Sequence, residues 1–140
     1  MSKVAVVYWS STGNTEAMAN AVADGAKAAG ADVSVLECAD FSANQVDEFD
    51  AIAFGCPAMG AEVLEEDEFD PMFTSCESKL SGKRIALFGS YGWGDGEWMA
   101  DWENRCKDDG AVLVADPVIC QEEPDDEATE KCNALGKSLV

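Results

Sequence analysis

The stretch Trp9-Ser10-Ser11-Thr12-Gly13-Asn14-Thr15 separates an apolar run, Val4 to Tyr8, from a helical pattern that begins near Glu16. This order predicts a buried strand, a tight loop and a helix in direct succession. The N–H groups at the start of a helix attract anions, and the loop adds hydroxyl and amide donors. Its glycine lets the backbone approach a ligand closely. We therefore predict a phosphate site held by dipoles alone, because the loop contains no Lys or Arg.

Helix capping is the alternative explanation of this loop, since Ser and Thr cap helices for purely structural reasons. The loop is not a nucleoside triphosphate loop, which needs two spaced glycines followed by Lys. The number of donors crowded between one strand and one helix favours the anion site.

Charge and length limit the classes of protein to which the chain can belong. Its 140 residues predict one domain, residues 1–140, with a sizeable core. Its net charge of −19 argues against nucleic acid and anionic membranes as partners, because both would be repelled. The acidity indicates either a solvated surface or a partner with a basic face.

Six cysteines are present, but the chain has no Cys-x-x-Cys pair and no His. We therefore expect no metal site and no thioredoxin-like chemistry, and we predict free thiols that partly fill the core. With no signal peptide and no apolar run long enough to span a bilayer, we expect a cytoplasmic protein.

Strands and helices alternate along the chain. The pattern predicts strands at 3–8, 32–37, 51–55, 84–90 and 111–120, the second at a sheet edge and the last bent at Pro117. Helices are predicted at 15–29, from Pro71 to about residue 78, at 97–108 with Asp95 as its cap, and at 125–138, with one helical turn within 41–48. Such alternation indicates an α/β fold with a parallel sheet covered on both faces.

Ligands bind such sheets beyond the carboxyl ends of the strands, where the winding reverses. Two further loops lie there. Pro57-Ala58-Met59-Gly60-Ala61-Glu62 offers a polarizable thioether and a hydrogen-bond acceptor, and Ser90-Tyr91-Gly92-Trp93-Gly94-Asp95-Gly96 places two aromatic rings among glycines. The alternatives are that Met59 is plain core and that the glycine loop is only a hydrophobic cap. Together with the first loop, these two loops predict a site for a phosphate and a flat ring with polar edges.

These three motifs, in this order at strand ends, resemble the short-chain flavodoxins along essentially the whole chain. The resemblance implies a doubly wound sheet of five parallel strands in the order 2-1-3-4-5, with FMN at the point where the winding reverses. It implies that residues 10–15 hold the phosphate, that Trp93 and Met59 cover the two ring faces, and that Glu62 accepts a hydrogen bond from the ring N3–H. Pro57 and Ser11 depart from the residues common in this family at those positions.

The resemblance further implies a low-potential one-electron carrier and not an enzyme. The Met59–Gly60 peptide can turn its carbonyl toward N5 of the flavin, so the carrier would cycle mainly between semiquinone and hydroquinone. We expect a monomer that docks transiently with larger redox enzymes. Their basic patches would meet an acidic rim formed by Glu62, Glu65, Glu66, Asp67 and Asp95.

Three other functions are weighed against this one. A flavin reductase would need room over the ring and a cationic group for a nicotinamide nucleotide, and these loops lack basic residues. A signalling receiver would need acidic residues where the chain has Trp9-Ser10 and Cys56-Pro57. A phosphatase with Cys56 as nucleophile would need an Arg six residues on, where the chain has Glu62.

Overall fold

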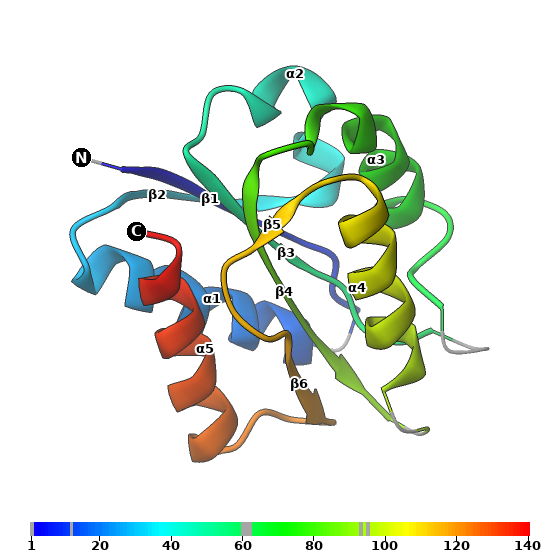
Figure 1. The fold of residues 1–140 in the computed structure, drawn as a ribbon. Helices are drawn as coiled ribbons and strands as arrows, with labels where there is room; N and C mark the ends of the chain where they lie inside the picture. Colours follow the sequence, from blue (N-terminus) through cyan, green and yellow to red (C-terminus); the bar gives the residue numbers. More distant parts are fainter. Residues whose placement is uncertain (1, 12, 60–62, 93, 95) are drawn as a thin grey trace.

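The computed structural model describes residues 2–11, 13–59, 63–92, 94 and 96–140, and a parallel sheet runs through its centre (Figure 1). Its strands are β1 (Lys3–Tyr8), β2 (Asp32–Glu37), β3 (Ala51–Gly55), β4 (Arg84–Tyr91), β5 (Val112–Leu113) and β6 (Val118–Gln121). They lie in the order β2-β1-β3-β4-β5, and β6 pairs with β4 beyond β5. The predicted α/β class and strand order are confirmed.

Burial of the strands follows their amino-acid patterns. All five residues of β3 are buried, as are the last five of β1, since helices cover both faces of these central strands. Among the strands of the described residues, β2 pairs with β1 alone, and it is exposed or half-buried along its length. The prediction that this strand lies at a sheet edge is confirmed.

The two faces of the sheet carry different layers (Figure 1). On one face lie α1 (Asn14–Ala28) and α5 (Asp126–Ser138), packed mainly through small and aliphatic side chains. On the other lie α2 (Ala43–Val46), α3 (Phe69–Cys76) and α4 (Glu97–Asp108), where Phe54, Phe69, Phe73, Trp98 and Trp102 fill the core. Two short 3-10 turns, Cys38–Asp40 and Glu77–Lys79, complete this layer.

The prediction of one continuous strand over residues 111–120 is wrong. This stretch forms two strands, β5 and β6, so the sheet of the described residues has six strands instead of five. Between the pair Leu113–Ile85 and the pair Val118–Phe88, this stretch advances by five residues and β4 by three. The chain thus carries two extra residues relative to β4 in the unpaired stretch between β5 and β6, and Pro117, which has no N–H to donate to the ladder, lies at the end of that stretch.

The start of α4 also differs from the sequence prediction. The N-cap of α4 is Gly96, not the predicted Asp95, which lies outside the described residues. By contrast, Asp125 caps α5, its side chain accepting from the Ala128 N–H at 2.8 Å.

The six cysteines are free, and all but the half-buried Cys120 are buried, as predicted. No helix in the described part of the chain is long and apolar enough to cross a membrane.

Candidate cofactor site

A cavity of about 240 Å³ opens where β1, β3 and β4 end. It is lined by Ser11, Asn14, Pro57, Ala58, Met59, Ser90, Tyr91, Gly92 and Glu122. The three loops singled out in the sequence therefore converge on one hollow at the carboxyl edge of the sheet, because parallel neighbouring strands end side by side.

The first loop ends at the N-terminus of α1, a helix of 15 residues. Gly13 is its N-cap and has a φ of +92°, a conformation that other residues rarely adopt. No side chain of the described residues caps this helix, and the Gly13 N–H donates to Ser10 Oγ at 3.2 Å. Helix N–H groups with no capping side chain fit an anion, and the helix dipole favours negative charge there.

Thr15 takes a different place from the rest of this loop. Its side chain is buried, and its hydroxyl is hydrogen-bonded to the Ser90 hydroxyl at 3.1 Å. This contact ties the start of α1 to the end of β4, so the first and third loops are held together. Ser10 is half-buried and Ser11 exposed, and Thr12 lies outside the described residues.

The second loop forms the middle of the site. Pro57, Ala58 and Met59 are half-buried, and the Ala58 N–H donates to the Ser90 carbonyl at 3.0 Å. Met59 pairs antiparallel with Val63 through two backbone hydrogen bonds of 2.9 and 3.2 Å. Gly60 and Glu62, two of the predicted site residues, lie outside the described residues.

Cys56, directly before this loop, is fully buried, and burial raises the pKa of its thiol far above the usual value. A buried thiol that holds its proton is a poor nucleophile, so the structure gives no support to the phosphatase alternative. The Cys56 carbonyl accepts a hydrogen bond from Trp98 Nε1 at 3.1 Å.

The third loop presents Tyr91, half-buried, and the exposed Gly92 and Gly94. The Tyr91 ring lies 5.5 Å from that of Trp98, centroid to centroid, which anchors the loop on α4. Gly94 has a φ of +88°. Trp93 and Asp95 lie outside the described residues.

A fourth segment at the cavity is missing from the sequence prediction. Gln121 Nε2 donates to the Gly92 carbonyl at 3.3 Å, and the Glu122 N–H donates to the Tyr91 carbonyl at 2.7 Å. Glu122 is the one non-glycine among the described residues with a positive φ, 59°. In the sequence it belongs to an acidic run after the last strand, and no signal distinguishes it from an ordinary exposed turn.

The predicted acidic rim is wrong at one position. Glu65 is only 5% exposed, because its carboxylate accepts hydrogen bonds from three backbone N–H groups at the start of α3. Glu66 and Asp67 are exposed as expected, and Glu62 and Asp95 lie outside the described residues.

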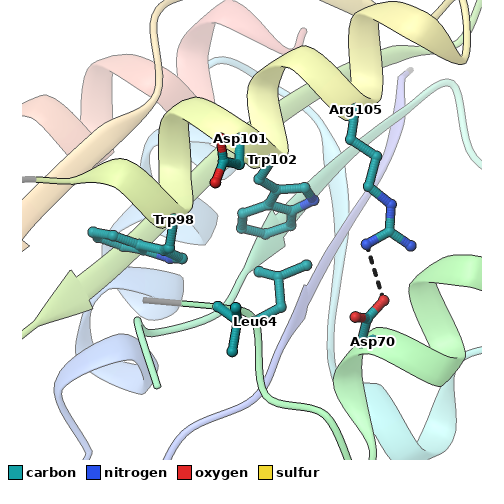
Figure 2. A pocket seen from close by; sticks show the side chains of 7 residues that line it. Leu64, Asp70, Trp98, Asp101, Trp102 and Arg105 are labelled. Carbon is teal, nitrogen blue, oxygen red and sulfur yellow. Dashed lines mark hydrogen bonds and ion pairs between the residues drawn. The ribbon is translucent and has the colours of Figure 1, made fainter. Parts of the chain in front are cut away.

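A second, smaller hollow of about 160 Å³ lies between α3 and α4 (Figure 2). Trp98, Trp102 and Leu64 form its apolar wall, and the ion pair of Arg105 with Asp70 lies beside it. Apart from Val63 and Leu64, its lining residues belong to the two helices. It is separate from the cavity at the strand ends and contains none of the predicted site residues.

The fold and the cavity define a doubly wound α/β protein that binds a cofactor at its strand ends. Comparison with known proteins identifies the family. The family model for flavodoxin matches residues 6–136. The flavodoxin of Clostridium beijerinckii is 48% identical over 135 residues, covering 96% of this chain and 97% of that protein. The flavodoxin of Megasphaera elsdenii is 47% identical over 137 residues, covering 98% of each.

The solution structure of two-electron reduced Megasphaera elsdenii flavodoxin superposes with a TM-score of 0.90 at 49% identity, covering 97% of each chain. The chain therefore belongs to the flavodoxin family, and its cofactor is FMN. The described residues fit this cofactor, because an uncapped helix start and a half-buried thioether line one cavity.

Proposed function

We propose that this flavodoxin is a low-potential one-electron carrier that holds FMN non-covalently in the cavity at the strand ends. The observation that carries the proposal is the convergence of the three loops on that cavity, beside the start of α1. Bound FMN supplies the chemistry, taking up and releasing one electron at a time. The protein then needs no substrate of its own, and we infer that it is not an enzyme.

The phosphate would lie at the start of α1. Its donors would be the loop side chains and N–H groups of Ser10, Ser11, Thr12, Gly13, Asn14 and Thr15. The loop carries no cation, so a dianionic phosphate would be held by hydrogen bonds and the helix dipole. Thr15 also holds Ser90 in place, so loss of this hydroxyl would loosen both ends of the site.

The flavin ring would lie between the second and third loops. Met59 would pack on one face and Trp93 on the other, and Glu62 would accept a hydrogen bond from N3–H. Pro57, Ala58, Gly60 and the run Ser90, Tyr91, Gly92, Gly94, Asp95 and Gly96 would form the walls. Rotation of the Met59–Gly60 peptide would favour the half-reduced flavin, so cycling would occur mainly between semiquinone and hydroquinone.

The charge of the chain supports a low potential. Adding an electron to the flavin places a further negative charge in a protein of net charge −19. One carboxylate about 12 Å away in water costs roughly 0.3 kcal/mol, and several together cost about 1–2 kcal/mol before salt screening. Because about 1.4 kcal/mol corresponds to roughly 59 mV for one electron, the field lowers the potential by several tens of millivolts.

The partners would be larger redox enzymes in the cytoplasm that dock on a monomer. Exposed carboxylates such as Glu66 and Asp67 would meet basic patches on those enzymes. The rate of electron transfer should therefore fall as salt rises, and a rate indifferent to ionic strength would contradict this docking mode.

Titration of the apoprotein with FMN and with riboflavin, followed by flavin fluorescence, tests the proposed site. We expect one FMN per chain with quenched fluorescence, and riboflavin binding at least about 100-fold weaker, because several charge-assisted hydrogen bonds are lost. Equal affinity for the two flavins would contradict the phosphate cradle. NADPH alone should not reduce the loaded protein at a significant rate; rapid reduction would favour the reductase alternative.

A further inference from the structure

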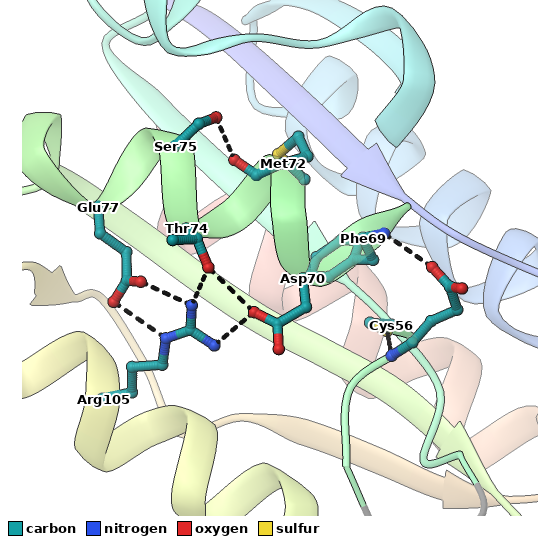
Figure 3. Close-up of polar contacts among 9 residues, drawn as sticks. Cys56, Phe69, Asp70, Met72, Thr74, Ser75, Glu77 and Arg105 are labelled. Atoms are coloured by element: carbon teal, nitrogen blue, oxygen red, sulfur yellow. Dashed lines mark hydrogen bonds and ion pairs between the residues drawn. The ribbon is translucent and has the colours of Figure 1, made fainter. Parts of the chain in front are cut away.

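The loop that carries Met59 is closed at its base by a contact between a side chain and the backbone. The Glu65 N–H donates to Cys56 Sγ at 3.3 Å, and the Met59–Val63 pair forms the next rung. Both ends of the segment from residue 56 to residue 65 are thus joined before the chain enters α3 (Figure 3).

Glu65 is fixed through its side chain as well as its backbone. Its Oε1 accepts from the N–H groups of Glu68 and Phe69, both at 2.7 Å, and its Oε2 accepts from that of Asp67 at 2.8 Å. The Asp70 N–H donates to the Glu65 carbonyl at 2.9 Å. Hydrogen bonds to an ionised acceptor are about twice as strong as neutral ones, so this residue holds the start of α3 firmly.

Cys56, at the other end of this segment, is held as firmly through its backbone. Its N–H donates to the Phe88 carbonyl at 3.2 Å, and its carbonyl accepts from Trp98 Nε1 at 3.1 Å. Gly89 permits this approach, since a Cβ there would collide with the Cys56 carbonyl oxygen. The thiol, 0% exposed, therefore offers a stationary acceptor at the end of β3.

We propose that Cys56 and Glu65 form a clasp that positions Met59 against the flavin and so sets the two one-electron potentials without touching the cofactor. This inference rests on the proposed function. The clasp and the Met59–Val63 pair fix the base of the loop, so Met59 stands at a defined place on the cavity wall. Contacts that distinguish one oxidation state of a cofactor from another depend on such placement by groups behind the first layer of contacts.

Cys56→Ala tests the clasp, because it removes the acceptor of the Glu65 N–H. The control is Cys132→Ala, which removes the same atom from an equally buried site in α5, across the sheet. In the FMN-loaded proteins, we expect Cys56→Ala to change the equilibrium constant of at least one one-electron step by tenfold or more, a shift of about 59 mV. Cys132→Ala should leave both constants within twofold, and Cys56→Ser, which restores an acceptor, should recover most of the change.

Amide hydrogen exchange of the apoprotein provides a readout without flavin. The Glu65 and Val63 amides should exchange at least tenfold faster in Cys56→Ala and at the wild-type rate in Cys132→Ala. Should Cys56→Ala not fold, Glu65→Gln replaces it: the amide group keeps one acceptor oxygen but turns a donor toward the Asp67 N–H. Its control is Glu66→Gln at an exposed position.

Unchanged potentials in the folded Cys56 and Glu65 variants would overturn the proposal, as would equal shifts in the Cys132→Ala control. Failure of the wild-type chain to bind FMN would overturn the proposed function itself, and with it the role of the clasp toward the flavin. Wild-type binding with unchanged potentials in the variants would overturn the clasp alone.

Discussion

Two polar clusters hold α3, one at its start and one along its length, and they are built differently (Figure 3). At its start, the buried Glu65 carboxylate binds backbone N–H groups beside the cofactor cavity. Along one side of the helix, from its second residue to just past its end, Arg105 of α4 binds side chains: Asp70 at 2.9 Å, Thr74 at 2.8 Å and Glu77 at 2.6 and 3.0 Å. We call the second group the Arg105 cluster.

The difference shows that contacts of one helix can both position the cofactor loop and stabilise the fold. Backbone partners do not change rotamer, so the Glu65 contacts fix the chain that leads out of the cofactor loop. Side-chain partners at 20–37% exposure are partly screened by water, so the Arg105 cluster joins α3 to α4 with less constraint on geometry. Loss of Glu65 should therefore affect both stability and the flavin, and loss of Arg105 stability alone.

The largest effect is expected for Glu65→Ala. Three N–H groups lose an ionised acceptor, and the free energy of unfolding of the apoprotein should fall by about 3–4 kcal/mol. Urea unfolding measures this. Glu66→Ala, which removes an exposed carboxylate from the adjacent position, should cost less than about 0.5 kcal/mol. Equal losses in the two variants would show that the buried cap does not stabilise α3.

Arg105→Met should cost less, about 2 kcal/mol. The variant loses the ion pairs and the stacking of the guanidinium over Phe73, at 5.0 Å, but Met keeps an apolar stem. Urea unfolding at low and high salt should show that the difference from wild type shrinks as salt rises. The potentials of bound FMN should stay at wild-type values, and a shift as large as that expected for Cys56→Ala would remove the contrast between the two clusters.

Asp109→Asn should have the smallest effect, and it depends on pH. Burial, and then Glu77 nearby, raise the pKa of Asp109 to about 6. The native state therefore holds a proton that the unfolded chain has already released, so this stabilisation is complete below pH about 4 and is lost as pH rises through about 6. Asn stays neutral, so the gain of the variant over wild type should increase by about 0.5–1 kcal/mol between pH 5 and 7.5, after allowance for screening.

Urea unfolding at the two pH values measures this gain, with the exposed neighbour Asp108→Asn as control. Burial by itself raises the pKa of Glu77, but the contact with Arg105 lowers it, and the net result is a pKa below the usual value. Glu77 therefore stays ionised between pH 5 and 7.5. A gain independent of pH would show that Asp109 is ionised throughout.

The fold could be predicted because strands buried on both faces, such as Val4 to Tyr8, are apolar at every position, and such runs are too short for a buried helix. The break at Pro117 was predicted only as a bend, since the sequence shows the missing donor but not which β4 residues the strand meets after it. The three loops of the site were predicted from their glycines, hydroxyls and aromatic rings at strand ends.

The sequence did not reveal contacts that depend on tertiary geometry. Glu65 begins an acidic run that is typical of an exposed surface, and its burial follows from the turn that aims three N–H groups at it. Glu122 reaches the cavity because β6 pairs with β4, a pairing that the broken last strand conceals. The placement of Cys56 beneath the loop likewise depends on Trp98, 42 residues away.

Spectroelectrochemical titration of the FMN-loaded protein is the decisive measurement for the proposed low-potential carrier. We predict two resolved one-electron steps, with the second midpoint below that of free FMN, because the second electron would enter a ring bound to a strongly acidic protein whose three cofactor loops contain no Lys or Arg. A single two-electron step, or a second midpoint at or above that of free FMN, would contradict it.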